Sequence, residues 1–168
     1  MWPKPGWPDE SPLRVWWADV ILLLAHGSRD PRHRAGIEAL AVEVATVAPD
    51  DDVRYAFFDF HGPDLVTAVA AAEPGAEVMV LPLLMSAGVH LQEDVPAAVA
   101  AAQLDRGDLR WRLKPPLPAA WLAAVVTQYL QVRAEVGPRG RGLVLVAAGS
   151  ARAGALAGIS ELAAELRG

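Results

Sequence analysis

Three side chains that can bind a metal ion or accept a proton recur along the chain at similar intervals. They are His26, Asp59 and His90, with about one strand–helix unit between one and the next. Each follows, directly or after a short loop, an apolar run of the kind that predicts a buried β-strand. Because the carboxyl ends of parallel strands lie along one edge of a sheet, we expect all three at the edge where open α/β folds bind ligands. Two neutral imidazoles and a carboxylate suit a divalent first-row metal, and the same groups accept protons near neutral pH.

Each of these residues also has a purely structural interpretation. His26 can be a turn residue that caps the next helix, and Asp59 and His90 can cap the helices that follow them. Their coincidence on one edge is what favours a functional site. Of the other two histidines, His61 lies beside a Gly-Pro turn and is a weaker candidate for a fourth ligand, and His33 is expected to face water from the first helix.

The turn after His26 is rich in basic residues, with Arg29, Arg32 and Arg34 following Ser28. Backbone N–H groups at a helix N-terminus attract anions, and arginine binds carboxylates through two parallel hydrogen bonds. A solvated first turn is the simpler interpretation. The functional alternative is a cationic edge on an acidic protein, at which Ser28, Arg29 and Arg32 bind a polycarboxylate ligand.

Strands and helices alternate along the chain, which predicts a parallel α/β sheet with right-handed crossovers. The run at 20–25 is apolar throughout, as in a strand covered on both faces, and is expected between the second and third strands. The run at 109–113 alternates between apolar and polar residues, which indicates one wet face near an edge of the sheet. The other predicted strands cover 53–58 and 78–81, and helices are expected along 37–47, from about 63 to 72, from about 91 to 102, and along 121–136. The first and last of these helices each have a stripe of apolar residues spaced three or four apart. The stripes are Ile37, Leu40, Val44 and Val47 in the first helix, and Trp121, Val125, Tyr129, Val132 and Val136 in the last.

The C-terminal part of the chain repeats its beginning. The segment 142–167 aligns with the segment 20–45 without a gap, and the identical positions include the Gly-Ser pair of the turn, Gly27-Ser28 and Gly149-Ser150. We interpret this as an internal repeat in which Ala148 takes the place of His26, so that the second copy keeps the strand–turn–helix unit and loses the chemistry. The predicted organisation is an irregular extension over 1–18, an α/β lobe that carries the site over 19–137, and an incomplete second repeat over 138–168. The orphan unit must pack on the first lobe or on another chain, and we expect a homodimer.

Composition excludes several classes of protein. Hydrophobic residues make up 53% and charged residues 21% of the 168 positions, which excludes disorder over most of the length. The chain has no cysteine, so disulfides, thiol catalysis, iron–sulfur clusters and cysteine-bound zinc are excluded, and any metal must have nitrogen and oxygen ligands. The net charge of −5 without a long basic run argues against nucleic-acid binding. Apolar runs are too short to cross a membrane and no secretory signal is evident, so a cytoplasmic location is expected.

Three segments of the chain resemble the motifs of the sirohydrochlorin chelatases, the cobalto- and ferrochelatases of cobalamin and sirohaem synthesis. The segments occur in the same order as in that family and at fitting intervals. They are LLLAHGSRDPR over 22–32, AFFDFHGPDL over 56–65 and LPLLMSAGVHLQEDVP over 81–96. The resemblance covers residues 20–113 and implies a three-layer, chelatase-like α/β fold. Some proteins of that family are single lobes that form dimers, and others contain two stacked lobes in one chain.

The resemblance also implies an activity, the insertion of Co²⁺ or Fe²⁺ into sirohydrochlorin, a macrocycle with eight carboxylates. The metal would be a substrate, with no permanently bound cofactor. His26, His90 and Asp59 would hold the metal and receive the pyrrole protons, while Met85 and Gly88 would join the basic turn in binding the macrocycle. Asp59 departs from the family, which usually has a glutamate there, one methylene longer.

Two other interpretations stay open. A phosphatase of the histidine type would have an arginine directly before its His-Gly pair, where this chain has Ala25. A non-catalytic metal- or tetrapyrrole-binding module would fit Asp59 and the incomplete repeat, and it would bind cobalt or a tetrapyrrole without turnover. The residues do not distinguish cobalt from iron or nickel, because geometry and supply usually decide metal selectivity.

Overall fold

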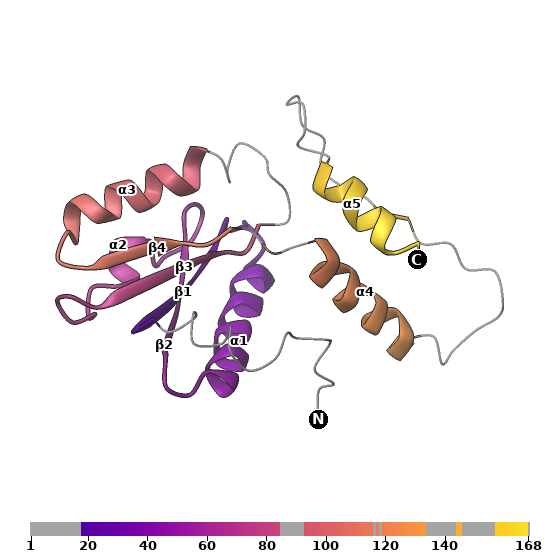
Figure 1. Cartoon of the computed structure of the whole chain (residues 1–168), viewed down its shortest axis with the longest axis horizontal. Helices are drawn as coiled ribbons and strands as arrows, with labels where there is room; N and C mark the ends of the chain where they lie inside the picture. Colours follow the sequence, from indigo (N-terminus) through magenta and orange to yellow (C-terminus); the bar gives the residue numbers. More distant parts are fainter. Residues whose placement is uncertain are drawn as a thin grey trace.

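The fold is built on a four-stranded parallel sheet (Figure 1). The computed structural model describes residues 18–84, 93–115, 117, 119–133, 144–145 and 157–167. The strands are β1 (Val20–Ala25), β2 (Asp52–Phe57), β3 (Glu77–Pro82) and β4 (Arg110–Leu113), in the spatial order β2-β1-β3-β4. The predicted parallel α/β sheet is therefore confirmed, with the first strand between the second and third and the alternating strand at an edge.

Helices cover both faces of this sheet. α1 (Pro31–Val47) lies on one face, and α2 (Leu65–Ala68) and α3 (Val95–Asp105) lie on the other (Figure 1). Two further helices, α4 (Ala119–Arg133) and α5 (Ala157–Glu165), pack against each other. Among the described residues, no helix is both long enough and apolar enough to span a membrane.

The central strand explains why the sheet needs two covered faces. Every residue of β1 is buried, and alternate side chains enter different clusters. Leu22 and Leu24 pack with α2 and α3, whereas Ile21 and Leu23 pack with α1. Each fully buried leucine stabilises the fold by about 2 kcal/mol relative to an exposed one. The uninterrupted apolar run therefore fixes β1 at the centre of the sheet. Its carboxyl end consequently lies between the carboxyl ends of β2 and β3.

Two helices differ from the apolar stripes expected of them. In α1 the fully buried residue is Ala41, and Val44 of the predicted stripe packs partly buried against the same core cluster. Val47, the last residue of the helix, is 82% exposed. In α4 the stripe residues Trp121 and Val125 are exposed, while Ala123 is buried. Alanine has a small side chain, so a helix that packs through its alanines can approach its neighbours closely. A sequence pattern of large apolar residues does not reveal such a packing face.

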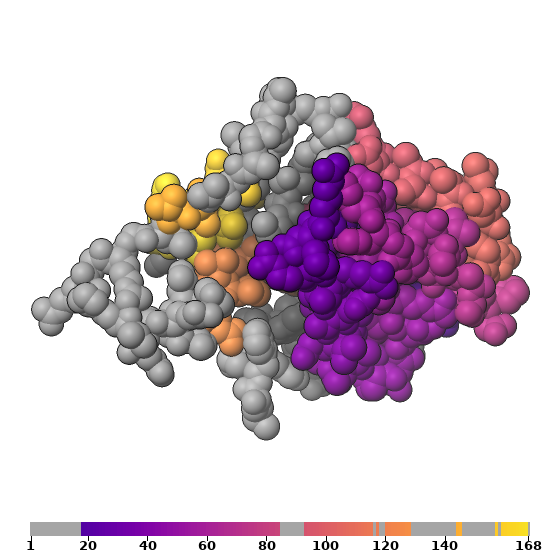
Figure 2. All heavy atoms as spheres, turned by 180° about the vertical axis from the view of Figure 1, so that it is seen from behind, coloured from indigo at the N-terminus to yellow at the C-terminus, as the bar shows by residue number. Residues whose placement is uncertain are grey.

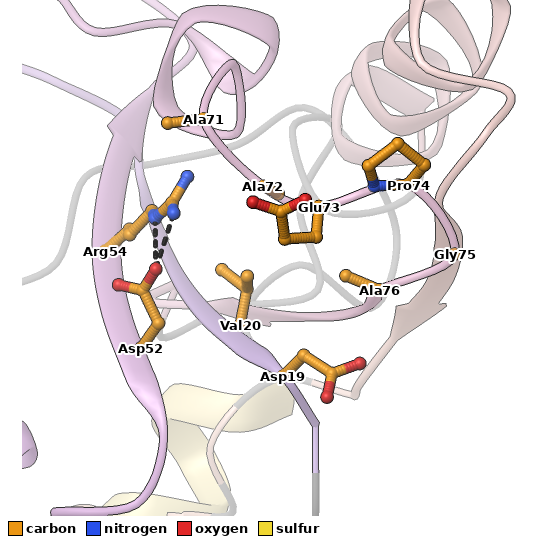
Figure 3. A pocket seen from close by; sticks show the side chains of 10 residues that line it. All are labelled: Asp19, Val20, Asp52, Arg54, Ala71, Ala72, Glu73, Pro74, Gly75 and Ala76. Carbon is orange, nitrogen blue, oxygen red and sulfur yellow. Dashed lines mark hydrogen bonds and ion pairs between the residues drawn. The ribbon is translucent and has the colours of Figure 1, made fainter.

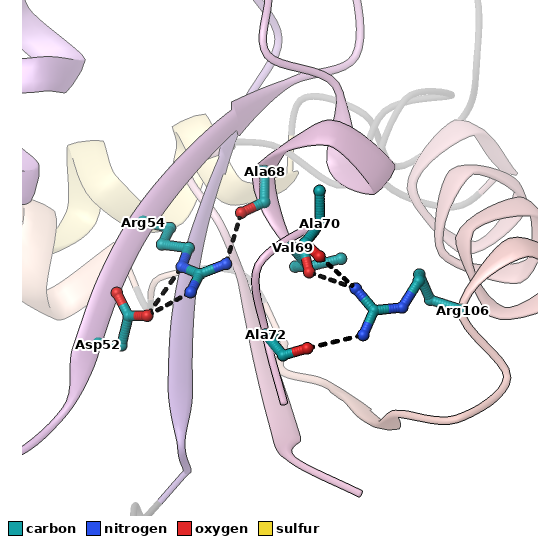
Figure 4. Close-up of polar contacts among 7 residues, drawn as sticks. All are labelled: Asp52, Arg54, Ala68, Val69, Ala70, Ala72 and Arg106. Carbon is teal, nitrogen blue, oxygen red and sulfur yellow. Dashed lines mark hydrogen bonds and ion pairs between the residues drawn. The ribbon is translucent and has the colours of Figure 1, made fainter. Parts of the chain in front are cut away.

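The second helix is much shorter than the expected span to residue 72. It ends at Ala68, and the carbonyl groups beyond it are bound by a side chain from a distant segment (Figure 4). The Arg106 guanidinium donates to the carbonyls of Val69 at 2.6 Å, Ala70 at 3.1 Å and Ala72 at 2.8 Å. These bonds stabilise a turn that places Val69 in the core, so the chain leaves the helix early.

Replacement of Arg106 by methionine is expected to lower the thermal midpoint by a few degrees, because the turn carbonyls lose a charged donor. Arg110→Met, at a nearby exposed position, is the matched control and should change the midpoint by less than one third as much. Thermal unfolding followed by circular dichroism measures both variants. Equal effects of the two would show that the Arg106 contacts do not stabilise the turn.

Part of the predicted organisation lies outside the described residues. This holds for almost all of the extension at 1–18 and for most of the strand half of the repeat at 142–152. The described helix α5 falls within the segment aligned with α1. The domain boundaries and the homodimer remain predictions.

Candidate functional site

The carboxyl ends of β1 and β2 bring two of the predicted site residues together. Hydrogen bonding between the strands continues past their ends, since the Phe58 N–H donates to the Ala25 carbonyl at 3.2 Å and the Asp59 N–H donates to the His26 carbonyl at 2.9 Å. The backbones of His26 and Asp59 are therefore direct neighbours, although a whole helix and strand separate them in the sequence. His26 is half-buried and Asp59 is exposed, so the candidate site opens to solvent.

Gly27 makes this close approach possible. Its φ of +99° lies in the left-handed region, and a Cβ atom built on it would lie 1.9 Å from the Asp59 carbonyl oxygen. Glycine alone combines this backbone conformation with this contact. The glycine after His26 therefore fixes the distance between the two strand ends, in addition to forming the turn toward α1.

The turn after β2 holds the Asp59 carboxylate by a local bond. The Phe60 N–H donates to Asp59 Oδ1 at 2.8 Å, and the His61 N–H donates to the Asp59 carbonyl at 2.7 Å. Phe60 has a φ of +61°, which is uncommon for a bulky side chain. One carboxylate oxygen is thus bound by the backbone, and the carboxylate is held near the strand end.

Aromatic rings surround the imidazole of His26. The Phe58 ring lies 4.7 Å from it between centroids at an interplanar angle of 50°, and the Phe60 ring lies 6.1 Å away at 22°. The Arg29 guanidinium carbon lies 5.8 Å from the centre of the Phe60 ring, within the range of cation–π attraction. The site therefore combines a basic nitrogen heterocycle, an arginine and an exposed aromatic ring.

Ser28 and Arg32 of the basic turn already have partners within it, and Arg34 pairs with Glu38 of α1. Ser28 Oγ accepts from the Asp30 N–H at 3.1 Å, and Asp30 caps α1 by accepting from the Arg32 N–H at 3.0 Å. The Arg32 guanidinium also binds Asp30, with Nε 3.0 Å from Oδ1, and this pairing lowers the pKa of the Asp30 carboxyl below its ordinary value. Figure 2 shows part of the indigo segment, which begins at residue 18 and includes this turn, at the surface. Arg29 is thus the basic residue placed over the aromatic ring, whereas Arg32 is already paired.

His33 and His61 both contact a different aromatic ring, that of Phe57. Their ring centroids are 6.1 Å and 5.3 Å from that of Phe57. Among the described side chains, His33 Nδ1 and His61 Nε2 are buried nitrogens without a hydrogen-bond partner. The expectation that His33 faces water is therefore wrong, because its ring turns toward the end of β2 rather than outward.

The third part of the predicted site lies outside the described residues. This applies to His90, Met85 and Gly88. Within the described ranges, no three histidine, aspartate or glutamate side chains lie close enough together to hold a metal ion. The structure thus brings together the two strand-end residues His26 and Asp59, and the three-ligand set stays a prediction.

The aromatic surroundings of His26 were not expected from the sequence. A weak signal was present in the pattern Phe-Phe-Asp-Phe over 57–60, which places rings on both sides of Asp59. Which of those rings contacts His26 depends on the left-handed turn at Phe60, and no sequence pattern predicts a left-handed phenylalanine.

A separate hollow of about 400 Å³ lies at the opposite end of the strands (Figure 3). Its polar groups serve the fold: Asp52 accepts from Arg54 Nε at 2.9 Å, and Asp19 Oδ2 accepts from the Glu77 N–H at 2.7 Å. Ligands of open parallel sheets bind at the carboxyl ends. This hollow at the amino ends is therefore a weaker candidate than the edge with His26.

Comparisons with known proteins agree with the fold. The CbiX family model matches residues 20–132. Curated relatives include the sirohydrochlorin cobaltochelatases of Methanopyrus kandleri, 33% identical over 46% of this chain and 55% of that protein, and of Methanococcoides burtonii, 28% identical over 45% and 60%. The match thus spans little more than half the length of these relatives.

Solved structures with the same fold come from two bacteria. A cobalamin (vitamin B12) biosynthesis CbiX protein from Marinobacter aquaeolei VT8 is 30% identical, with a TM-score of 0.58 over 69% of this chain and 97% of that one. SirB from Bacillus subtilis with Fe³⁺ is 19% identical, with a TM-score of 0.74 over 90% of this chain and 61% of that one. The second likeness extends the shared fold beyond the four-stranded lobe.

Proposed function

Because the chain belongs to the CbiX family, we propose that it is a chelatase that inserts a divalent metal, Co²⁺ or Fe²⁺, into sirohydrochlorin. The observation that carries the proposal is the hydrogen bond between the Asp59 N–H and the His26 carbonyl. It holds the backbones of a histidine and an aspartate side by side at the carboxyl ends of β1 and β2, the edge at which parallel sheets bind ligands. The relatives named sirohydrochlorin cobaltochelatase supply the substrate class.

Metal insertion requires a weak metal site and a base beside it. A dication enters the macrocycle while two ring nitrogens lose their protons, so groups that release the metal readily and accept protons lower the barrier. His26 is proposed to receive a pyrrole proton and to hold the incoming metal together with Asp59 and His90. The local bond from the Phe60 N–H to Asp59 Oδ1 supports a carboxylate that is held in place despite its short side chain.

The basic turn is proposed to bind the carboxylates at the rim of the macrocycle, through Arg29 and the Ser28 region. Met85 and Gly88 are proposed contacts of the macrocycle on sequence grounds. The cytoplasmic location also remains a prediction.

Anaerobic incubation of the full chain with sirohydrochlorin and either Co²⁺ or Fe²⁺ tests the proposal by the change in absorbance. A rate above the uncatalysed one is expected with at least one metal, and the ratio of the two rates gives the metal preference. A chain that binds Co²⁺ or sirohydrochlorin without any rate enhancement would be a binding module instead. The residue that favours this second candidate is Asp59 itself, one methylene shorter than the glutamate that the resemblance leads us to expect at this position.

Arg29→Gln and Arg32→Gln form a matched pair for the basic turn. Arg29→Gln is expected to raise the KM for sirohydrochlorin about tenfold, since a charge-assisted pair with a carboxylate is lost. Arg32→Gln is expected to change the KM less than twofold, because Asp30 already binds the Arg32 guanidinium, whose side chain is 89% exposed. Steady-state kinetics with the sirohydrochlorin concentration varied measures both. A larger increase of the KM in Arg32→Gln than in Arg29→Gln would contradict the assignment of Arg29 as the arginine that binds the macrocycle carboxylate.

A further inference from the structure

Phe60 combines an unusual backbone with an exposed ring. Its φ of +61° is rare for a bulky residue, and its side chain is 51% exposed. Such conformations persist only where the surroundings hold them, and they occur preferentially at binding sites. Here the two hydrogen bonds around Asp59, from the Phe60 N–H and the His61 N–H, hold the turn. The turn thus presents an aromatic ring to solvent beside the candidate base.

The neighbours of this ring give the surface its chemistry. The imidazole of His26 is nearly parallel to it, at 22° and 6.1 Å between centroids, an offset-stacked arrangement. The Arg29 guanidinium lies 5.8 Å from the ring centre. A flat conjugated ligand on Phe60 would therefore lie beside a nitrogen base and within reach of a cation that binds carboxylates.

We propose that Phe60 is a substrate-positioning residue on which the face of a planar, carboxylate-bearing macrocycle stacks, with a peripheral carboxylate on Arg29. This inference rests on the proposed function for the identity of the macrocycle. Phe58 contacts His26 as well, but it packs against the core cluster. Phe60 is the ring that offers an exposed surface, so it positions the macrocycle while Phe58 supports the imidazole.

Titration of the full chain with metal-free sirohydrochlorin tests the proposal without requiring turnover. Phe60→Asn removes the ring and keeps a residue that tolerates positive φ, and Phe60→Leu keeps an apolar side chain. Both are expected to raise the Kd about fivefold to tenfold, in line with a lost aromatic contact. Phe60→Trp is expected to keep the Kd within twofold of wild type.

Trp121→Leu is the matched control, since Trp121 is 48% exposed on α4, and it should leave the Kd unchanged. Arg29→Gln combined with Phe60→Asn should weaken binding by less than the product of the single effects, because the two side chains share one contact. An unchanged Kd in Phe60→Asn, or a Trp variant as weak as the Asn variant, would overturn the proposal.

The failure of the proposed function would be distinguishable from the failure of this inference. If the wild-type chain does not insert metal but Phe60→Asn still weakens sirohydrochlorin binding, the chelatase proposal is wrong and the positioning role of Phe60 stands. If the wild-type chain inserts metal and Phe60→Asn has the same KM for sirohydrochlorin, the chelatase proposal stands and the positioning role of Phe60 is wrong.

Discussion

Replacement of Gly27 by alanine is expected to destabilise the fold by about 3 kcal/mol and to abolish function. The new Cβ would lie 1.9 Å from the Asp59 carbonyl oxygen and 2.9 Å from its carbon, both backbone atoms that cannot rotate away. The φ of +99° adds strain for any residue with a Cβ. The chain must therefore separate the ends of β1 and β2, which breaks the bond from the Asp59 N–H to the His26 carbonyl.

Urea denaturation of Gly27→Ala measures this effect, with Gly36→Ala as the control. Gly36 lies within α1, and nothing lies within 4 Å of a Cβ built on it. Alanine favours helices over glycine by about 1 kcal/mol, so the control should be slightly stabilised. If Gly27→Ala lowers the free energy of unfolding and Gly36→Ala raises it, the loss arises from the contact between the strand ends. A Gly27→Ala variant as stable as wild type would contradict the close contact between Gly27 and the Asp59 carbonyl.

Replacement of His26 by alanine is expected to lower the rate of metal insertion by at least about 100-fold, the usual contribution of a positioned acid or base. The imidazole lies at the end of the central strand beside two phenylalanine rings, and neither ring can accept a proton in its place. The affinity for Co²⁺ should also fall, because a nitrogen ligand is lost. Stopped-flow absorbance and calorimetric titration with Co²⁺ measure the two effects.

His33→Asn is the control for His26→Ala, because His33 packs against Phe57 and away from the His26 ring contacts. Its rate should remain within about twofold of wild type, while its stability falls. A His26→Ala variant with an unchanged rate would place the chemistry elsewhere in the chain. A similar loss in both variants would indicate that the histidines act through the fold.

Burial patterns in the sequence are sufficient to predict the sheet and the edge that carries the candidate site. The uninterrupted apolar run of β1 requires cover on both faces and hence a central position. The alternating residues of β4 require one exposed face and hence an edge. Both patterns depend on burial alone, which acts residue by residue along a strand, so they can be recognised without coordinates. The placement of His26 and Asp59 at adjacent strand ends follows from the same rule.

Contacts between distant segments set the details that these patterns do not reach. α2 ends early because Arg106, which lies beyond α3 in the chain, binds the carbonyls that follow the helix. In α1 the fully buried residue is the small Ala41, whereas Val47 at the end of the helix is exposed. Neither outcome is encoded in the local spacing of apolar residues.

The immediate surroundings of His26 are also set by contacts between segments that are distant in the sequence. Gly27 is necessary because the Asp59 carbonyl lies where its Cβ would be, and Phe60 presents its ring to solvent from a left-handed turn. Local patterns report the average burial of a side chain, whereas these features depend on which two atoms meet from segments far apart in the sequence. The sequence therefore places the chemistry at one edge of the sheet, and the packing of two strand ends decides how that chemistry is presented.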